Sequence, residues 1–363
     1  MSKKRIIVGM SGGVDSSVAA LILKNEGHRV EGMFMKNWEE DDTEEYCSAT
    51  QDLEDTKKVC EHLDIPLRTV NFSFEYWDNV FKDFIKSYKL GYTPNPDVIC
   101  NEKIKFHTFL NFALSEKAEY MATGHYAKIR KLKNTFHLFK SKDKTKDQTY
   151  FLHSLAQDQL KNVIFPLASL QKNKVRKIAK DFSLPVHDKK DSTGVCFIGE
   201  RKFKDFLKKY IDCTPGKIID ASNNHLGNHD GLPFYTIGQR SGLGIGGVKD
   251  SNDEAWYVAD KNKKTNELVV VQGKNHKSLY HTKIKTKKIH WIDDKNKNQN
   301  TKLGAKIRYL QDDQECIILK ADNESSVVEF ANPQRAVAPG QYIVFYSKQE
   351  CLGGAIISEP LST

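Results

Sequence analysis

The sequence predicts an α/β protein, with a doubly wound parallel sheet followed by a small β-rich central domain and a C-terminal β-barrel. Apolar, strand-like runs alternate with helix-period segments over the first two hundred residues, an order typical of a parallel sheet with right-handed crossovers. After Cys213 the pattern changes to short β-type runs separated by Gly and Asn turns. The chain has 363 residues, too many for one ordinary core, so we expect two or three domains.

The first domain is expected to cover residues 1–205 as a sheet covered by helices. Its predicted strands are short apolar runs, and its predicted helices carry apolar residues at helical spacing. In such a sheet the ligand crevice lies at the carboxyl ends of the strands. The expected strands are 5–9, 29–35, 67–72 and 120–124, and the expected helices are 16–25, 49–63, 74–90, 102–117, 172–182 and 200–210.

The remaining chain is expected to form the central domain over residues 206–280 and the barrel over residues 281–363. The predicted β-type runs of the central domain are TPGKIID, GLPFYTIGQRSGLGIGG, AWYVADKN and ELVVVQG. Those of the barrel are KIHWI, AKIRYL, ECIILKA, SSVVEFA, QYIVFYS and GGAIIS, spaced as in a small barrel. No helix follows GLGIGG, so we expect it to form tight turns rather than a dinucleotide-binding loop.

Composition limits the class of protein. No apolar run approaches the ~20 residues needed to span a bilayer, and MSKKRII has no signal-peptide pattern, so a soluble cytoplasmic protein is expected. Seven cysteines without C-x-x-C or zinc-like spacing favour free thiols over a disulfide framework. The acidic stretch NWEEDDTEEYC fits a solvated loop and helix start better than a metal site, and no metal site is expected.

The net charge of +9 is distributed unevenly. Residues 39–64 hold eleven acidic side chains against two lysines, whereas residues 128–146 hold eight basic side chains against one Asp. Residues 283–306 hold eight lysines against two Asp. Two interpretations stay open for the basic stretches: a solvated surface, or a footprint for a polyanion such as tRNA.

The stretch GMSGGVDSS, residues 9–17, joins the first predicted strand to the first predicted helix. Its glycines let backbone N–H groups approach an anion, the helix N-terminus adds partial positive charge, and Ser11, Ser16 and Ser17 offer hydroxyl donors. It lacks the Walker lysine and the dinucleotide glycine spacing. It resembles the loop of the PP-loop ATP pyrophosphatases, which implies that ATP is split to AMP and pyrophosphate to adenylate a substrate oxygen. Asp15 would then help to place magnesium or pyrophosphate.

Two further stretches each contain a cysteine. In TPNPDVICN, residues 93–101, Cys100 lies near an expected helix N-terminus, which can lower a thiol pKa. Asp97 would exchange protons with a substrate, because a carboxylate raises rather than lowers a neighbouring thiol pKa. In KKDSTGVCFIG, residues 189–199, Cys196 follows a loop-forming sequence. Taken singly, either cysteine fits an inert buried thiol better than a reactive one.

The combination of GMSGGVDSS, KNWEEDD, TPNPDVICN, ATGHYA, KDQTYFL, DSTGVCFIG, YTIGQRSGLGIGG and PGQY resembles the MnmA family of tRNA-specific 2-thiouridylases, essentially from end to end. The resemblance implies that ATP adenylates the C2 oxygen of the wobble uridine and that sulfur then displaces AMP. It implies that Cys196 carries a persulfide and that Cys100 attacks it, leaving a Cys100–Cys196 disulfide, with Asp97 as general acid/base. Two thiols suit sulfur transfer, and an unpaired anticodon base costs little to extrude.

The same resemblance assigns binding residues and partners. ATP, with Mg²⁺, is expected at Gly9, Met10, Ser11, Gly12, Gly13, Val14, Asp15, Ser16, Met35 and Gly124. Contacts with tRNA are expected at Asn95, Pro96, Asp97, His125, Lys146, Asp147, Gln148, Arg308, Tyr309 and Gln341. The expected partners are the tRNAs for Lys, Glu and Gln and a sulfur-donor protein, either a cysteine desulfurase or a sulfur-relay protein, with no membrane partner.

The residues leave other functions open. A PP-loop amidotransferase-type ligase would use ammonia and would need no cysteine pair. Another tRNA-modifying PP-loop enzyme would share the loop. A binding-only alternative is an RNA-binding module that retains a nucleotide-responsive loop without turning over ATP.

Overall fold

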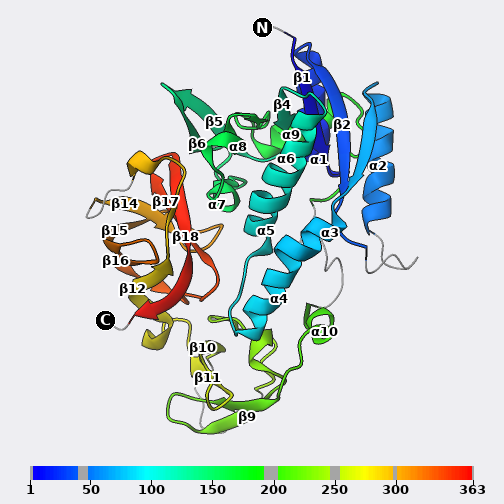
Figure 1. Ribbon diagram of the computed structural model, residues 1–363. Helices are drawn as coiled ribbons and strands as arrows, with labels where there is room; N and C mark the ends of the chain where they lie inside the picture. The colour runs from blue at the N-terminus through cyan, green and yellow to red at the C-terminus, as the bar shows by residue number, and fades with distance from the viewer. Residues whose placement is uncertain (1–2, 40–47, 192–202, 246–253, 297–300, 362–363) are drawn as a thin grey trace.

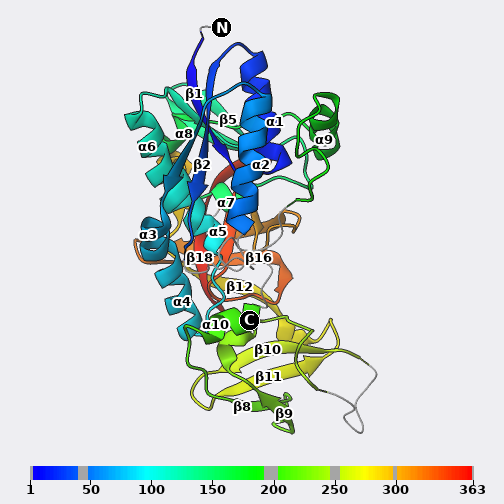
Figure 2. The same ribbon diagram turned by 90° about the vertical axis from the view of Figure 1, so that its right-hand side faces the viewer.

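The computed structural model describes residues 3–39, 48–191, 203–245, 254–296 and 301–361 (Figure 1). They form a parallel sheet with helices, a small central sheet and a barrel, and the central sheet lies at the end of the molecule farthest from the N-terminus (Figure 2). Across the described residues, we find no helix that combines the length and the apolar character needed to cross a membrane. The predicted fold class is confirmed.

The first region contains a five-stranded sheet in which every pairing is parallel, with the order β3-β2-β1-β4-β7. The strand order reverses between β1 and β4, and in open sheets of this kind ligands bind beside such a switch point. The strands are β1 (Arg5–Met10), β2 (Arg29–Lys36), β3 (Leu67–Asn71), β4 (Tyr120–Ala122) and β7 (Val163–Ile164).

Helices cover both faces of this sheet, as successive β1 side chains show. Ile6 and Val8 belong to a core cluster with α1 and α9, whereas Ile7 belongs to a larger cluster with α4 and the π-helix η2 (Cys100–Phe109). The period-2 alternation of a strand thus supplies two cores from one apolar run. The α-helices in this region are α1 (Val14–Asn25), α2 (Ser48–His62), α3 (Ser73–Tyr76), α4 (Lys82–Lys89), α5 (Pro96–Ile99), α6 (Leu110–Ser115), α7 (Thr149–Leu152), α8 (Gln157–Leu160), α9 (Lys172–Asp181) and α10 (Phe203–Lys208).

Two of the predicted long helices contain π-helical turns. The helix predicted over residues 74–90 is continuous through α3, η1 (Trp77–Phe81) and α4, as predicted. The helix predicted over residues 102–117 begins earlier, because α5 and η2 (Cys100–Phe109) precede α6. Asn95 caps α5 by accepting the Asp97 N–H at 3.1 Å, and Pro96 occupies the first turn, so the start six residues upstream follows from ordinary capping.

The central sheet has the order β10-β11-β8-β9, formed by β8 (Gly216–Ile219), β9 (His225–His229), β10 (Trp256–Asn262) and β11 (Glu267–Gln272). The prediction for GLPFYTIGQRSGLGIGG is wrong over its described part, residues 231–245, which contain the 3₁₀ turn η3 (Leu232–Phe234) and bends but no strand. Gly238, Gly242 and Gly244 have positive φ angles, which interrupt an extended chain.

The C-terminal sheet closes as a six-stranded antiparallel barrel in the order β12-β16-β15-β14-β17-β18, because β12 also pairs with β18. Its interior includes Ile284, Ile318, Val328 and Phe345, all fully or almost fully buried. The barrel strands are β12 (Tyr280–Lys287), β14 (Leu303–Lys306), β15 (Gln314–Ala321), β16 (Ser325–Arg335), β17 (Tyr342–Ser347) and β18 (Glu350–Leu361), with β13 (His290–Trp291) beside β18 and 3₁₀ turns η4 (Lys277–Leu279) and η5 (Asp294–Asn296).

A hairpin from the first region extends the barrel sheet. It consists of β5 (Ala127–Leu132) and β6 (Thr135–Lys140), and β6 pairs with β18 through Phe139 and Glu350 (Figure 1). His137 and Glu350 add a side-chain contact of 2.6 Å between the same two strands. The sequence pattern predicts only a basic run here, so the hairpin is a new feature. The domain boundaries at 205 and 280 stay predictions.

Candidate active site

The loop after β1 is ordered by hydrogen bonds among its own residues. The Ser11 N–H donates to Ser16 Oγ at 3.2 Å, and both Ser16 Oγ and Ser17 Oγ donate to the Gly13 carbonyl, at 3.1 and 2.8 Å. Gly13 is the N-cap of α1 and has no side chain to accept the first N–H groups of that helix. The loop therefore presents backbone donors and a helix N-terminus at the carboxyl edge of β1, the arrangement that binds phosphate.

Two glycines allow close backbone approach around this loop. Gly12 has φ +70°, and a Cβ there would lie 2.4 Å from the Asp52 carbonyl oxygen of α2. Gly124, which follows β4, would place a Cβ 2.7 Å from backbone atoms of Asp15 and Ser16. The exits of β1 and β4 are therefore in direct contact, and any larger residue at either glycine would displace the loop.

The carboxylate of Asp15 points to protein donors. Lys172 Nζ lies 2.7 and 2.8 Å from its two oxygens, and the Tyr126 hydroxyl donates to it at 2.8 Å. Burial and the nearby Asp15 charge raise the pKa of Tyr126, so this hydroxyl remains a proton donor at neutral pH. The proposed role of Asp15 in placing magnesium thus requires exchange of these partners.

Asp191 forms ion pairs with three basic side chains beside the same loop. Lys146, Lys172 and Arg176 contact its oxygens at 2.8, 2.7 and 2.7 Å. Burial opposes ionisation of this carboxyl, but the hydrogen bonds from Lys146 and Lys172 outweigh it and hold the pKa at about 2. Lys146 is a predicted tRNA contact. Lys172 is not among the predicted site residues, because 157 positions separate it from Asp15 and no local motif marks it.

Cys100 and Asp97 lie on the helix formed by α5 and η2. Cys100 is the fifth residue of this helix and is 4% exposed, packed in the core cluster that also contains Val98 and Ile104. Asp97 is exposed, yet partial desolvation by the surrounding protein raises its pKa above the usual value, while the charge of Lys105 opposes that shift. A carboxyl with a raised pKa is suited to exchange a proton near neutral pH.

Lys105 is a second basic residue that the sequence motifs do not single out. In the π-helical η2, each N–H bonds about five residues back, so Lys105 follows Cys100 by one such turn. Its charge also acts on His125, whose pKa is lowered well below the usual value by burial and by Lys105. His125 contacts Thr123 Oγ1 at 2.8 Å and the Phe106 ring at 5.5 Å. The predicted tRNA contact His125 is therefore an uncharged imidazole at neutral pH.

The segment that leads into α5 is held by the central sheet region and the barrel. The Thr93 N–H donates to the Pro339 carbonyl at 2.9 Å, and Gln341 Nε2 donates to the Thr93 carbonyl at 2.7 Å. The Thr93 hydroxyl lies 3.2 Å from that of Thr236. Gln341 is a predicted tRNA contact, and its amide nitrogen is engaged by Thr93.

Two lysines of β10 and its turn support the same segment from the central sheet. Lys261 Nζ donates to the Gly91 carbonyl at 3.2 Å, and Lys263 Nζ lies 4.5 Å from the centre of the Tyr92 ring. Burial, and then the charge of Lys263, lower the pKa of Lys261 to about 8. We refer to residues 91–95 together with these contacts as the three-way junction.

Three other predicted tRNA residues make contacts within the protein. Asp147 is buried, accepting hydrogen bonds from the Ser141 N–H and the Thr149 hydroxyl. Gln148 accepts from the Tyr126 N–H at 2.9 Å. The Arg308 guanidinium donates to the Ala336 carbonyl at 2.8 Å, and burial followed by the charge of Arg335 lowers its pKa.

The remaining predicted site residues are distributed as follows. Tyr309 packs against Phe151 with ring centres 4.5 Å apart, and Met10, Val14 and Pro96 are buried, whereas Met35 at the end of β2 is half-buried. Cys196, the predicted persulfide carrier, lies outside the described residues. The described structure therefore brings together the phosphate loop, Gly124, His125, Lys146 and the Asp97–Cys100 helix, but does not place the second cysteine.

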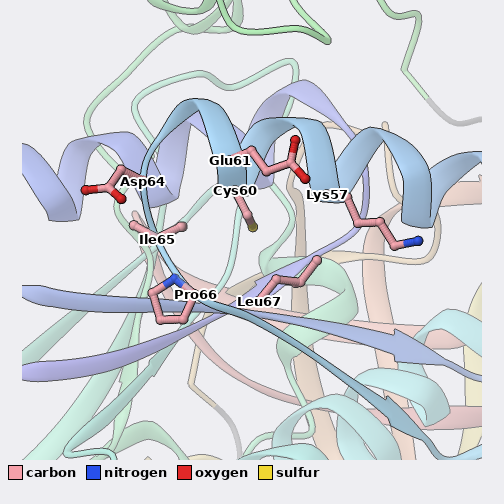
Figure 3. Close-up of a pocket in the computed structure, with 7 residues that line it drawn as sticks. All are labelled: Lys57, Cys60, Glu61, Asp64, Ile65, Pro66 and Leu67. Atoms are coloured by element: carbon pink, nitrogen blue, oxygen red, sulfur yellow. The ribbon is translucent and has the colours of Figure 1, made fainter.

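A surface pocket of about 360 Å³ lies elsewhere on the first region (Figure 3). It is lined by the end of α2 and the start of β3, including Cys60, Asp64 and Leu67. These positions are at the amino edge of β3, opposite the edge that carries the phosphate loop. Burial raises the pKa of the Cys60 thiol to about 11, and the pocket contains none of the predicted site residues.

Known families match the chain over nearly its whole length. Residues 4–200 match a tRNA methyl transferase HUP domain, residues 204–272 a tRNA methyl transferase PRC-barrel domain, and residues 255–357 an aminomethyltransferase beta-barrel domain. Three bacterial proteins, each named tRNA-specific 2-thiouridylase MnmA, align with this chain over nearly the full length of both sequences. That of Legionella pneumophila (strain Lens) is 54% identical, covering 98% of this chain and 99% of its own. That of Pseudomonas fluorescens (strain Pf0-1) is 51% identical, with 99% and 97% covered. That of Francisella tularensis subsp. novicida (strain U112) is 50% identical, with 98% and 100% covered.

Proposed function

This chain belongs to the MnmA family of tRNA-specific 2-thiouridylases, and from that membership we propose that it uses ATP to exchange the C2 oxygen of the tRNA wobble uridine for sulfur. The observation that carries this conclusion is the end-to-end identity of 50 to 54% with relatives of that name. The domain descriptions mention methyl transfer, but the full-length relatives are named as thiolating enzymes. The amidotransferase alternative has no support among these relatives.

The nucleotide is proposed to bind at the carboxyl edge of the sheet, with its phosphates on residues 9–16. Support comes from the uncapped N-terminus of α1 and from the glycine contacts that hold this loop. Met35 and Gly124 are proposed to flank the adenosine, and Asp15 to hold Mg²⁺ once the nucleotide is present. Oxygen ligands of this kind suit Mg²⁺, which usually keeps substrate phosphates in its coordination shell.

The first chemical step is proposed to be adenylation. The C2 oxygen attacks the α-phosphorus of ATP, the bond to the β-phosphate oxygen breaks, and pyrophosphate leaves. The N3 proton of the uracil must be lost as the C2–N3 double bond forms, and Asp97 is proposed to accept it. The raised pKa of Asp97 makes its carboxylate a better base than an ordinary aspartate.

The second step is proposed to transfer sulfur. The Cys100 thiolate attacks the inner sulfur of a persulfide on Cys196, which forms the Cys100–Cys196 disulfide and releases hydrosulfide. Hydrosulfide adds to C2 and AMP leaves, so the thiocarbonyl replaces the original carbonyl. A dithiol reductant then restores both thiols, and a sulfur-donor protein, a cysteine desulfurase or a relay protein, reloads Cys196.

The substrate is proposed to be tRNA, in particular the tRNAs for Lys, Glu and Gln, and the protein is proposed to act in the cytoplasm. Exposed Arg130, Lys131 and Lys133 on the β5–β6 hairpin offer positive charge for the phosphate backbone. The predicted contacts at Arg308, Tyr309, Lys146 and His125 occupy the barrel and the loops next to the site. A base in an anticodon loop is unstacked with little cost, which suits a site that acts on a splayed base.

The test is a thiolation assay with purified protein, Mg-ATP, unmodified tRNA and a persulfide donor. The wild-type protein is expected to form 2-thiouridine, detected by mass spectrometry of digested tRNA, together with AMP that depends on tRNA. Cys100→Ser and Cys196→Ser are each expected to abolish thiolation while leaving tRNA-dependent release of pyrophosphate measurable, because adenylation precedes sulfur transfer. Cys213→Ser, which changes a half-buried thiol of the central region, is the matched control. Absence of 2-thiouridine with the wild-type protein would overturn the proposal.

A further inference from the structure

Lys172 forms ion pairs with the carboxylates of Asp15 and Asp191 beside the phosphate loop. Its ammonium lies 2.7 and 2.8 Å from the oxygens of Asp15 and 2.7 Å from Asp191, and its side chain is only 12% exposed. Its backbone N–H donates to Asp143 at 2.8 Å, which fixes the first residue of α9 in place. One cation is thus shared between two anions in a position that the phosphate-loop motif does not include.

The residues around Lys172 would keep both carboxylates hydrogen-bonded if its ammonium moved away. Asp191 keeps Lys146 and Arg176 at 2.8 and 2.7 Å, and Asp15 keeps the Tyr126 hydroxyl at 2.8 Å. Neither carboxylate would therefore be left without a donor if the ammonium moved by a few ångströms on its flexible four-carbon stem.

The position of Asp15 determines how close the Lys172 ammonium lies to phosphates bound at the loop. Asp15 is the second residue of α1 and stands two residues after Gly13, whose backbone forms the phosphate cradle with that of Gly12. A side chain bonded to Asp15 is therefore within one side-chain rotation of phosphates bound there. The loop has no lysine of its own, and a triphosphate attracts an ammonium more strongly than a single carboxylate does.

We propose that Lys172 is a phosphate ligand of the nucleotide site, supplied by α9 in place of the lysine that the loop lacks. When Mg-ATP binds, the ammonium moves from Asp15 and Asp191 to the phosphates, and Asp15 becomes available to Mg²⁺. There Lys172 stabilises the negative charge that develops on pyrophosphate as it leaves. This inference rests on the proposed function in one respect, that the nucleotide is ATP.

The test compares binding of Mg-ATP and of adenosine by isothermal titration calorimetry. Lys172→Met is expected to weaken Mg-ATP binding about 10- to 100-fold, the value of one or two charge-assisted hydrogen bonds, and to leave adenosine binding unchanged. Lys174→Met is the matched control, because Lys174 is an exposed residue of the same helix. Lys172→Arg is expected to recover part of the affinity. Equal loss for adenosine would indicate a distorted site and would overturn the proposal.

A double variant separates a phosphate ligand from a counter-ion of Asp15. If Lys172 only neutralised Asp15, removing both charges would restore binding, and Asp15→Asn with Lys172→Met would bind Mg-ATP as tightly as Asp15→Asn alone. We expect the double variant to bind at least about tenfold more weakly than Asp15→Asn. Equal affinities would overturn the inference while leaving the proposed function intact. Failure of the wild-type protein to bind Mg-ATP would instead contradict the proposed function.

Discussion

The phosphate loop and the three-way junction are two backbone segments that are held in place in opposite ways. In the loop, residues 9–17 are ordered mainly by bonds to one another, such as Ser17 Oγ to the Gly13 carbonyl. In the junction, Thr93 makes its hydrogen bonds with residues more than 140 positions away, at Thr236, Pro339 and Gln341. The backbone turn of the phosphate loop is therefore ordered locally, although its Asp15 side chain bonds to Tyr126 and Lys172, whereas the segment entering the Asp97–Cys100 helix depends on all three parts of the chain.

This difference predicts different failures. A change within the phosphate loop should damage nucleotide binding first. A change in the barrel or central sheet that reaches the junction should leave nucleotide binding intact and slow the steps proposed for Asp97 and Cys100. Measuring Mg-ATP affinity and single-turnover thiolation on the same variants therefore tests the comparison directly.

The largest effect is expected from Gly12→Ala. Its φ of +70° is costly for alanine, and the new methyl group would lie 2.4 Å from the Asp52 carbonyl oxygen. Left-handed strain contributes about 1–3 kcal/mol before the clash is counted, and we expect Mg-ATP affinity to fall at least about 100-fold. Calorimetry measures the Mg-ATP affinity, and thermal melting measures the loss of stability.

The control for this variant is Gly13→Ala in the same loop. Gly13 has φ −101°, and its nearest neighbour to a new Cβ is Ser11 Oγ at 3.5 Å, so alanine should leave the melting temperature nearly unchanged. Equal destabilisation by the two substitutions would contradict the role given to the Gly12 backbone.

A smaller effect is expected from Gly340→Ala on the barrel side of the junction. Gly340 has φ +92°, and a Cβ there would lie 2.9 Å from Tyr92 Cβ and 3.0 Å from the Thr93 nitrogen. We expect single-turnover thiolation to fall about tenfold, because the strain is about 1–3 kcal/mol, while Mg-ATP affinity stays within about twofold.

Gly27→Ala separates backbone strain from displacement of the junction. Gly27 has a similar φ of +83° but nothing within 4 Å of a new Cβ, so this variant should lose some stability and keep its thiolation rate. A tenfold loss of Mg-ATP affinity in Gly340→Ala would show that the two regions are not independent.

Gln341→Ala is expected to have a still smaller effect. It removes the 2.7 Å hydrogen bond to the Thr93 carbonyl, worth about 1 kcal/mol, so thiolation of bound tRNA should slow about three- to tenfold. Filter binding measures the tRNA affinity on the same variant, which we expect to be nearly unchanged if Gln341 acts by holding the junction. Weaker tRNA binding with an unchanged rate would favour the direct contact that the family resemblance implies.

The smallest effect is a shift in the pH dependence of thiolation. Desolvation raises the pKa of Asp97, so the rate should fall at acidic pH as the carboxylate is protonated, with a midpoint above that of an ordinary aspartate. Lys105 lowers this pKa, so Lys105→Met should move the midpoint to higher pH. Single-turnover rates measured across the acidic range give this midpoint, and Asp97→Asn should remove the fall in rate at acidic pH. A midpoint that moves to lower pH in Lys105→Met would contradict the assignment.

The parts of the molecule that could be predicted from sequence are those specified by neighbouring residues. Strand β1, helix α1 and the loop between them follow from an apolar run, a helical period and glycine spacing within twenty residues. The parallel sheet and the barrel follow from the order and length of such runs. The sequence prediction begins the helix of α5 and η2 at residue 102, six residues later than α5 begins in the structure, although Asn95 and Pro96 form a recognisable cap before the cysteine.

The features that could not be predicted depend on residues far apart in the chain. The β5–β6 hairpin has an alternating pattern, but the charge of Lys128, Arg130 and Lys131 conceals it, and its pairing with β18 has no local signal. The network of Lys172 with Asp15 and Asp191, and the engagement of Gln341 with Thr93, likewise arise only when separate elements pack together. Positions can be carried over from a family motif, but their hydrogen-bond partners cannot.

The pairing of β6 with β18 also sets an order of events during synthesis on the ribosome. His137 and Glu350 are 213 positions apart, so β6 is translated long before the strand that covers its free edge. At about 5–20 residues per second, that edge stays open for roughly 10–40 s. Exposed strand edges are templates for pairing between chains, so β6 offers such a template to other nascent chains throughout this interval. The exposed Arg130, Lys131 and Lys133 on the hairpin add like charges that oppose such pairing between nascent chains.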